Sequence, residues 1–450
     1  MAQHIAIDLG ATSGRIVVGN GKELDVIYRF NSFNEKILGS YYWEIFKIFS
    51  EIKIGLRKAF ERYGAEIVSI GIDGWGVDYG LLDKNGNLIN PIYHYRDKRT
   101  SYVFDEVNSL IGKNRLFSTT GIAFQEYNTI YQIFSQAKEN MELFTVVKNY
   151  LSVPDLFAYF LSGKIVNERT HASTTALYNC NTKDWAWDII EDLKLPKSMF
   201  SKIVDSGTIL GSLTKDLSDE FKISHDVKIV ASATHDTAAA VSNIRNSAYI
   251  SSGTWSLMGV NLESPILNSG ALSNGFTNET GSQNQITFVK NIMGMWISNQ
   301  CIDDYYGKNS KKDWQQIDKL TEENLSYDGY IDPTDLIFLE PSSASNKMVD
   351  RVNMNLKEKG FKHTENIGEV LISVYRGLAK TYASSLKQIE KITNKKIDSL
   401  QIIGGGCKNK LLNSLTEAEI GKTVKTGPVE ATAMGNIQAQ MDALEYNENL

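Results

Sequence analysis

The alternation of apolar and polar residues predicts strands and helices that follow one another along the first half of the chain. Apolar runs at 5–7, 15–18 and 68–72 have the length of buried strands. Between them, the stretch from Trp43 to Tyr63 carries apolar residues at the spacing of one helix face, at Ile45, Ile48, Phe49, Ile52, Leu56 and Phe60. This order is typical of an α/β domain.

The same order returns in the second half of the chain. Strands are predicted at 249–251, 256–260 and 400–403, and a long helix at 366–392. Because 450 residues are enough for two or three domains, we place a boundary near Asn243 and expect domains at 1–243 and 244–450. The polar segment 303–329 is expected to be a solvated helix or a surface excursion rather than a linker.

His235 and Asp236 stand where an apolar run ends and an alanine-rich run begins. Strand ends in α/β sheets open onto ligand crevices, so a carboxylate at this point is placed to act as a base. The alternative is that Asp236 caps the helix. Two further turns, rich in glycine, serine and threonine, follow strands in the same way and favour catalysis.

The first of these turns joins the runs at 5–7 and 15–18 and predicts a β-hairpin. It supplies flexible glycines, hydroxyl donors and one positive charge, at Gly10, Thr12, Ser13, Gly14 and Arg15. Such a turn can hold phosphate, although an ordinary hairpin uses similar residues. Because the preceding carboxylate of Asp8 would repel a bare phosphate, we expect Mg²⁺ between them.

The second of these turns and a separate glycine-rich turn lie in the second half of the chain. One lies between the strands predicted at 249–251 and 256–260 and contains Ser252, Gly253 and Thr254. The other is the triple glycine 404–406, which ends a predicted strand and leads into a helix. Glycine there would let a flat ligand lie against the backbone, while a tight strand-to-helix turn explains the same residues.

Asp73 and Asp78 flank Trp75 within a glycine-rich stretch. Carboxylates accept hydrogen bonds from sugar hydroxyls, and aromatic rings cover the apolar faces of sugars. The composition therefore suits carbohydrate recognition. A core position for Trp75 and a turn cap at Asp78 are the alternatives.

Seven motifs in order carry a family resemblance: D-L-G-A-T-S-G-R, G-I-D-G-W-G-V-D, Y-R-D-K-R-T, S-A-T-H-D-T-A, S-S-G-T-W-S-L-M-G, K-N-I-M-G-M-W and I-I-G-G-G-C-K-N. From Ile5 to about Asn436 the chain resembles the FGGY carbohydrate kinases, and H-D-T followed by S-S-G-T-W-S-L points to their rhamnulose branch. The resemblance implies an α/β fold of two ribonuclease H-like domains, of the actin and hexokinase type, with an interdomain cleft. It also implies ATP-dependent phosphorylation of a ketose at O1, with L-rhamnulose favoured.

The resemblance assigns roles to individual residues. Asp236 matches the proton acceptor of the family, and Asp8 lies near its metal, Mg²⁺. The ATP positions match Ala11, Thr12, Ser13, Gly14, Arg15, Thr254 and Gly405. The sugar positions match Gly76, His235, Asp236, Thr237 and Asn291, to which we add Trp75 and Asp78. A further ATP contact, a glutamine in the family, falls on Asn299, with Gln300 one position later, and both are kept as candidates.

The chain also departs from the family pattern. The family's N-E-G-G is N-E-T-G at 278–281, and its acidic, proline-rich loop corresponds to 340–345. Because the sequence stops at Leu450, we expect it to lack the C-terminal helix that returns to the first domain. Kinases for L-fuculose, xylulose or glycerol are the alternatives, as is a non-catalytic sugar-binding or regulatory protein on the same fold.

Composition narrows the choice of partners and location. Lys and Arg number 47 against 53 Asp and Glu, so the net charge of −6 lacks the basic excess of a nucleic-acid-binding protein. No apolar run is long enough to span a membrane, and none suggests secretion. Cys180, Cys301 and Cys407 form no C-x-x-C pair. We therefore expect a cytoplasmic enzyme with small-molecule partners, either monomeric or dimeric.

Overall fold

The computed structural model describes residues 1–308 and 310–448, and the chain divides into two compact α/β units. The first unit contains residues 1–243, 261–288 and the described residues from Glu430 onward. The second contains residues 244–260 and 289–429. The single boundary expected near Asn243 is therefore only the first of the points at which the chain passes from one unit to the other.

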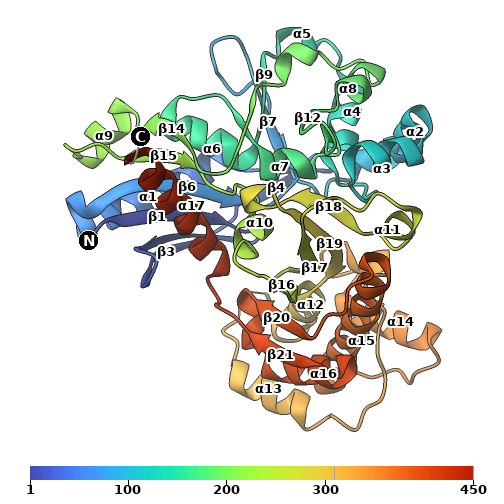
Figure 1. Ribbon diagram of the computed structural model, residues 1–450. Helices are drawn as coiled ribbons and strands as arrows, with labels where there is room; N and C mark the ends of the chain where they lie inside the picture. The colour runs from blue at the N-terminus through green and yellow to red at the C-terminus, as the bar shows by residue number, and fades with distance from the viewer. Residues whose placement is uncertain (309, 449–450) are drawn as a thin grey trace. The chain divides into compact units, whose positions relative to one another are not determined.

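The first unit is built on a mixed six-stranded sheet in the order β14-β15-β6-β1-β2-β3. β1 is antiparallel to β2, which confirms the predicted hairpin, and β6 is parallel to both β1 and β15. Figure 1 shows these strands in blue and green. Their bounds are β1 (Gln3–Leu9), β2 (Ser13–Gly19), β3 (Leu24–Asn31), β6 (Ile67–Gly74), β14 (Thr208–Ser212) and β15 (Lys228–Ala231).

Two long helices, α1 (Ile45–Tyr63) and α17 (Ala431–Glu448), cover opposite faces of this sheet. A Cβ on Gly55 of α1 would lie 2.2 Å from Ile16, whereas Ile437 of α17 packs with Val17. Successive strand residues point to opposite faces, so the two helices flank β2 from either side. The helix expected from Trp43 to Tyr63 is thereby confirmed.

The expectation that the chain lacks a C-terminal helix returning to the first domain is wrong. α17 belongs to the first unit and packs on β1, on β6 and on the short helix α10 (Asp236–Ala240) (Figure 1). Its apolar pattern is interrupted by Asn436 and Gln440, both fully buried. These amides are paired inside the unit, so periodicity along the sequence gives little sign of the helix.

Residues between β6 and β14 form a region that the sequence pattern did not resolve. It has its own core, in which Tyr131, Tyr150, Tyr178 and Trp185 are almost fully buried. Its main elements are β7 (Tyr79–Leu82), α2 (Ser101–Ile111), α3 (Lys113–Thr120), α4 (Thr129–Glu139), β9 (Asn149–Ser152), α6 (Val153–Ser162), α7 (Arg169–Thr174) and α8 (Trp187–Asp192).

The second unit repeats the α/β plan. Five strands of a six-stranded sheet lie in the order β19-β17-β16-β20-β21, with β16 antiparallel to β17 and parallel to β20. The strands are β16 (Ala248–Ser252), β17 (Trp255–Leu262), β19 (Ile286–Met293), β20 (Ser399–Ile403) and β21 (Thr423–Thr426). The main helices are α12 (Met295–Tyr306), α13 (Trp314–Glu322), α14 (Met348–Glu358), α15 (Ile367–Thr393) and α16 (Lys410–Ile420).

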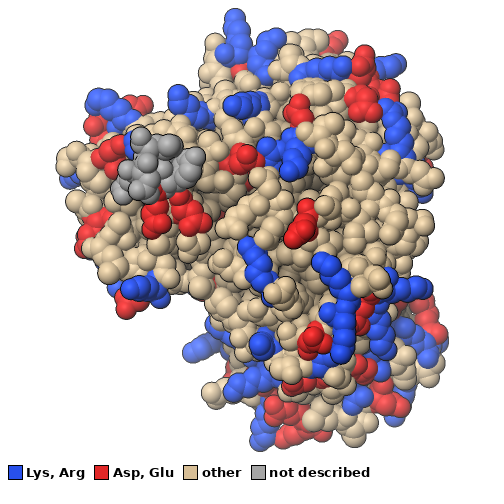
Figure 2. Space-filling view, in the orientation of Figure 1, with Lys and Arg blue, Asp and Glu red and all other residues tan. Residues whose placement is uncertain are grey.

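The polar segment expected at 303–329 contains the end of α12 and all of α13, apart from residue 309, which lies outside the described residues. α13 buries Ile317 against α15 and leaves its charged side chains to solvent, as a solvated helix should. Acidic and basic side chains are interspersed over the face shown in Figure 2. Among residues 1–308 and 310–448, none of the helices combines the length and apolar character needed to cross a bilayer.

Candidate active site

Asp236 is the first residue of α10, a short helix that follows β15. The preceding loop is tied to the end of β6, because Gly74 donates its N–H to the Thr234 carbonyl at 2.9 Å. The N-cap position is His235 and makes no side-chain capping bond, so helix capping does not explain this pair. Burial raises the pKa of Asp236 to about 6, against an opposing hydrogen bond from Thr237.

Glu168 fixes the loop that leads to Asp236. Its side chain is fully buried at the start of α7, and one oxygen, Oε2, accepts hydrogen bonds from Thr170 and Thr234. The Thr234 N–H and hydroxyl donate at 3.1 and 2.9 Å. A charged acceptor with several donors is a rigid anchor, so the backbone two residues before Asp236 is held in place.

His235 lies between two carboxylates. Its Nε2 is 3.6 Å from Asp236 Oδ1, and its Nδ1 is 3.4 Å from Oε2 of Glu279 on β18 (Thr277–Thr280). Burial lowers the pKa of His235, and the Glu279 charge opposes this. His235 Nδ1 and Glu279 Oε2 are buried without hydrogen-bond partners in the described part of the chain. Buried polar atoms of this kind point to a polar ligand or water.

Gly76 faces the same histidine. A Cβ added at Gly76 would lie 3.5 Å from His235 Nε2 and 3.6 Å from the Thr174 hydroxyl. Thr237 is buried in α10 beside Asp236. The structure thus brings together Gly76, His235, Asp236 and Thr237, four of the predicted sugar contacts.

Asp8 is the last residue but one of β1 and is paired with Arg15 across the hairpin. Arg15 contacts Asp8 Oδ2 through Nε at 2.8 Å and Nη2 at 2.6 Å, and its Nη1 is 2.7 Å from Glu430. Arg29 joins the other oxygen of Glu430 at 2.7 Å. The guanidinium expected to bind phosphate is therefore already shared by two carboxylates of the same unit.

Asp8, Asp73 and Asp236 form what we call the acidic cluster. Asp8 and Asp73 are direct partners in the parallel register of β1 and β6. Burial and the charge of Asp8 raise the pKa of Asp73 well above its usual range, with a smaller effect from Asp236 in the same direction. Burial also raises the pKa of Asp8, and Arg15 opposes it. Mutual repulsion of this kind favours a cation close by.

The predicted phosphate turn spans Ala11 to Arg15. Ala11, Thr12 and Ser13 are at least partly exposed, and Gly10 donates its N–H to the Ser13 carbonyl at 2.9 Å. Gly14 has a packing role, because a Cβ there would lie 2.3 Å from the Phe30 ring on β3. The turn therefore keeps exposed backbone and hydroxyl groups next to Asp8.

Trp75 and Asp78 lie in the core instead. Trp75 is 5 % exposed and packs against Trp43, with the ring centroids 4.2 Å apart and the rings tilted by 32°. Asp78 is fully buried and accepts from Trp43 at 2.6 Å, from Trp75 at 3.0 Å and from Gln132 at 2.9 Å. With both oxygens occupied, Asp78 does not fit the direct sugar contact expected from the sequence, and the core alternative for Trp75 fits better.

The remaining predicted residues belong to the second unit. Thr254 lies in the turn between β16 and β17, and its carbonyl accepts the N–H groups of Gly294 and Trp296, both at 3.2 Å. Asn291 lies on β19. On α12, Asn299 is exposed, whereas Gln300 accepts the Ser342 N–H at 2.8 Å. Asn299 therefore has the more available side chain of the two.

The three glycines at 404–406 directly follow β20, and they differ in backbone conformation and in packing. Gly404 has a φ of +79°, a left-handed conformation that favours glycine. A Cβ on Gly406 would lie 1.9 Å from the Ser252 hydroxyl, whereas a Cβ on Gly405 would meet nothing within 4 Å. Packing explains Gly406, and the open space at Gly405 fits a ligand.

Several residues of the site escaped sequence reasoning, namely Glu168, Glu279, Glu430 and Asn436. Each acts across a long sequence separation, for example 363 residues between Asn436 and Asp73. Glu279 lies in the N-E-T-G segment, where an acid before a glycine turn was the available signal. The other three had no comparable signal.

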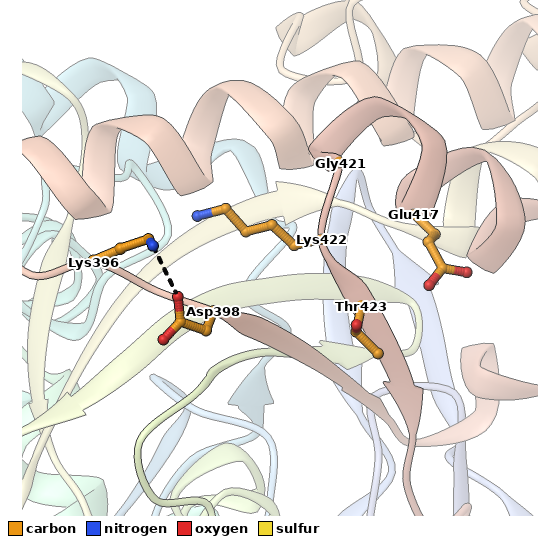
Figure 3. A pocket seen from close by; sticks show the side chains of 6 residues that line it. All are labelled: Lys396, Asp398, Glu417, Gly421, Lys422 and Thr423. Carbon is orange, nitrogen blue, oxygen red and sulfur yellow. Dashed lines mark ion pairs between the residues drawn. The ribbon is translucent and has the colours of Figure 1, made fainter.

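A surface pocket of the second unit contains none of the predicted site residues. Its walls come from the chain before β20, from α16 and from the start of β21 (Figure 3). Lys396 and Asp398 form an ion pair at 3.6 Å there, with both side chains strongly exposed. Mixed, solvated charges give this pocket no chemistry of its own.

Both the sequence and the fold of this chain are similar to those of known proteins. The chain is similar over nearly its full length to rhamnulokinases from Halalkalibacterium halodurans (40 % identity, 100 % of this chain and 95 % of the relative) and Bacillus subtilis (37 %, 98 % and 90 %). Its fold is similar to a xylulose kinase from Lactobacillus acidophilus (TM-score 0.79, 15 % identity, 100 % and 90 % covered) and to Plasmodium falciparum glycerol kinase with ADP (0.79, 13 %, 99 % and 90 %).

The family models agree with these relatives. Residues 3–242 match the N-terminal domain of the FGGY family of carbohydrate kinases, and residues 248–444 match its C-terminal domain. Together the two matches cover most of the chain, and the relatives are well above 30 % identical. The chain therefore belongs to the FGGY family of carbohydrate kinases and is an ATP-dependent sugar kinase.

Proposed function

We propose that this kinase transfers the γ-phosphoryl group of ATP to O1 of L-rhamnulose. The observation that carries the proposal is the full-length similarity to proteins named rhamnulokinase, at 40 % and 37 % identity. The fold neighbours that act on other substrates are only 13–15 % identical and support the fold alone. L-Fuculose, xylulose and glycerol are therefore less favoured substrates.

Asp236 is proposed as the general base. It removes the proton from the O1 hydroxyl while O1 attacks the γ-phosphorus and the bond from that phosphorus to the bridging oxygen of ADP breaks. Its pKa of about 6 keeps the carboxylate ionised at neutral pH and makes it a stronger base than an ordinary aspartate. His235 and Gly76 would line the sugar, with Glu279 orienting the histidine ring.

The ATP contacts are proposed for the Ala11–Gly14 turn in the first unit and for Thr254, Asn299 and Gly405 in the second. Arg15 is assigned to holding Asp8 rather than to direct phosphate binding, because two carboxylates already pair with it. Asn291 is kept as a sugar contact. Asp78 and Trp75 are assigned to supporting the sugar-site backbone from the core.

Mg²⁺ fits the acidic cluster. The described residues include no group of three or more histidine, cysteine, aspartate or glutamate side chains that could hold a metal by themselves. Mg²⁺, however, needs only one or two carboxylates together with water and phosphate oxygens. Asp8 would hold the ion with Asp73 nearby, and the ion would supply positive charge to the phosphates of ATP.

A substrate panel tests the proposal. ADP release is measured by a coupled assay with L-rhamnulose, L-fuculose, xylulose and glycerol, and the phosphate position is read by NMR. L-Rhamnulose should give the highest kcat/KM, with phosphate on O1. A higher kcat/KM for another substrate would refute the substrate assignment.

We also propose a cytoplasmic location, because ATP is the donor and all three cysteines are free.

A further inference from the structure

The C-terminal helix α17 reaches the acidic cluster through two neighbouring residues, Gly435 and Asn436. Asn436 is fully buried, and its Nδ2 donates to Asp73 Oδ2 at 2.6 Å. Gly435 lies against α10, where a Cβ would come within 2.0 Å of the Ala239 carbonyl oxygen. One turn of α17 therefore contacts both the strand that carries Asp73 and the helix that carries Asp236.

The amide of Asn436 is held in one orientation. Gln440 Nε2 donates to Asn436 Oδ1 at 2.7 Å and to the Ile5 carbonyl at 2.9 Å, and the Ser69 hydroxyl donates to Gln440 Oε1 at 2.6 Å. Because Oδ1 of Asn436 already accepts a hydrogen bond, Nδ2 is the group left for Asp73. This buried chain of hydrogen bonds fixes which atom meets the carboxylate.

A glycine on β6 leaves room for the side-chain amides of Asn436 and Gln440. A Cβ on Gly71 would lie 2.3 Å from Asn436 Oδ1 and 2.8 Å from Gln440 Nε2. Any larger residue would push the amides away from the strand. The glycine therefore stands two residues before Asp73 for a physical reason, namely close approach of α17.

Asp73 is expected to lower the stability of the fold. It is 0 % exposed, and its second oxygen, Oδ1, has no hydrogen-bond partner in the described part of the chain. A buried carboxylate with one donor and a carboxylate neighbour, Asp8, lowers stability. A functional role explains why it is held there.

We propose that Asn436 is a positioning residue for phosphoryl transfer. It fixes the carboxylate of Asp73 beside Asp8 and Asp236 and so keeps the acidic cluster in its working arrangement. This inference rests on the proposed function of that cluster. It assigns a role in turnover to the C-terminal helix, far from the catalytic motifs in sequence.

The test is a double-mutant cycle on kcat. Asn436→Leu removes the donor at similar volume and should lower kcat by about 10- to 100-fold, as small misplacements of catalytic groups do, with both KM values within about threefold. In an Asp73→Asn background the same substitution should lower kcat by less than about twofold, because the group that it positions has been removed. A purely structural role would not produce this loss of additivity.

Ile437→Val is the matched control, since Ile437 is buried in the neighbouring position of α17 and packs in an apolar cluster with Ala6 and Val17. It should lower the Tm and leave kcat unchanged. If Asn436→Leu does not fold, the smaller Asn436→Ser carries the same expectation. A kcat within threefold of wild type, or losses that multiply in the double variant, would overturn the proposal. The assay uses whichever ketose the wild type turns over fastest, so a wrong substrate assignment leaves this result readable.

Discussion

Replacing Asp236 by asparagine removes the proposed base with little change of shape. The asparagine Oδ1 can still accept the Thr237 hydroxyl, which donates to Asp236 Oδ1 at 3.2 Å. The substitution removes the negative charge that faces His235, 3.6 Å away, and that adds to the repulsion within the acidic cluster. We therefore expect Asp236→Asn to fold and to bind sugar.

The loss of turnover should be large. A well-placed general base contributes about 10²- to 10⁴-fold, which corresponds to roughly 3 to 5 kcal/mol of activation free energy. The raised pKa, about 6, supports an effect inside this range, because a carboxylate closer to neutral pH accepts the alcohol proton more readily. Asparagine cannot accept a proton at any working pH.

The assay is steady-state ADP release at saturating sugar and ATP, with sugar affinity measured separately by calorimetry. Asp192→Asn is the charge-matched control, since Asp192 is an exposed partner of Arg115 at the surface. That variant should keep wild-type kcat. A kcat for Asp236→Asn within threefold of wild type would remove Asp236 from the mechanism.

Three further outcomes are expected. Because the Asp236 carboxylate must be ionised to act, kcat/KM should fall as pH drops through about 6, and a flat profile from pH 5 to 7 would contradict its role as the base. Asp8→Ala should raise the Mg²⁺ concentration needed for half-maximal rate or abolish activity, so an unchanged Mg²⁺ titration would exclude a metal role. Gly405→Ala should raise the KM for ATP, by up to about tenfold, and leave the Tm unchanged. Gly406→Ala should instead lower the Tm, because its Cβ would meet Ser252. If Gly405→Ala and the wild type have equal KM values for ATP, ATP binds elsewhere.

The sequence was most informative where local patterns decide structure. The helical spacing from Ile45 to Phe60 and the hairpin around Gly10 depend on neighbouring residues, and both are confirmed. The position of Asp236 between a strand and a helix is also confirmed, because apolar runs and alanine-rich runs are separated there by only a few residues. Their chemical roles remain predictions.

Features that depend on contacts between distant residues could not be predicted from the sequence. Asp78 and Trp75 have the composition of a sugar site, but only tertiary contacts, such as the bond from Trp43, show that they are buried. Asn436 and Gln440 interrupt the apolar pattern of α17, so the helix that carries them was missed. Polar residues that are satisfied inside a fold look, in sequence, like polar residues on its surface.

The repeated passage of the chain between the two units has a consequence for dissection of the protein. A fragment ending at Asn243 would include Asp8, Asp73 and Asp236 but would lack Glu279 and Asn436, which come from later segments. His235 would lose Glu279, one of its two carboxylate neighbours, and Asp73 would lose its hydrogen-bond donor. The first unit is therefore completed only by residues from Glu430 onward, and Asp73 has no donor from Asn436 until that segment has been synthesised and has folded onto the sheet.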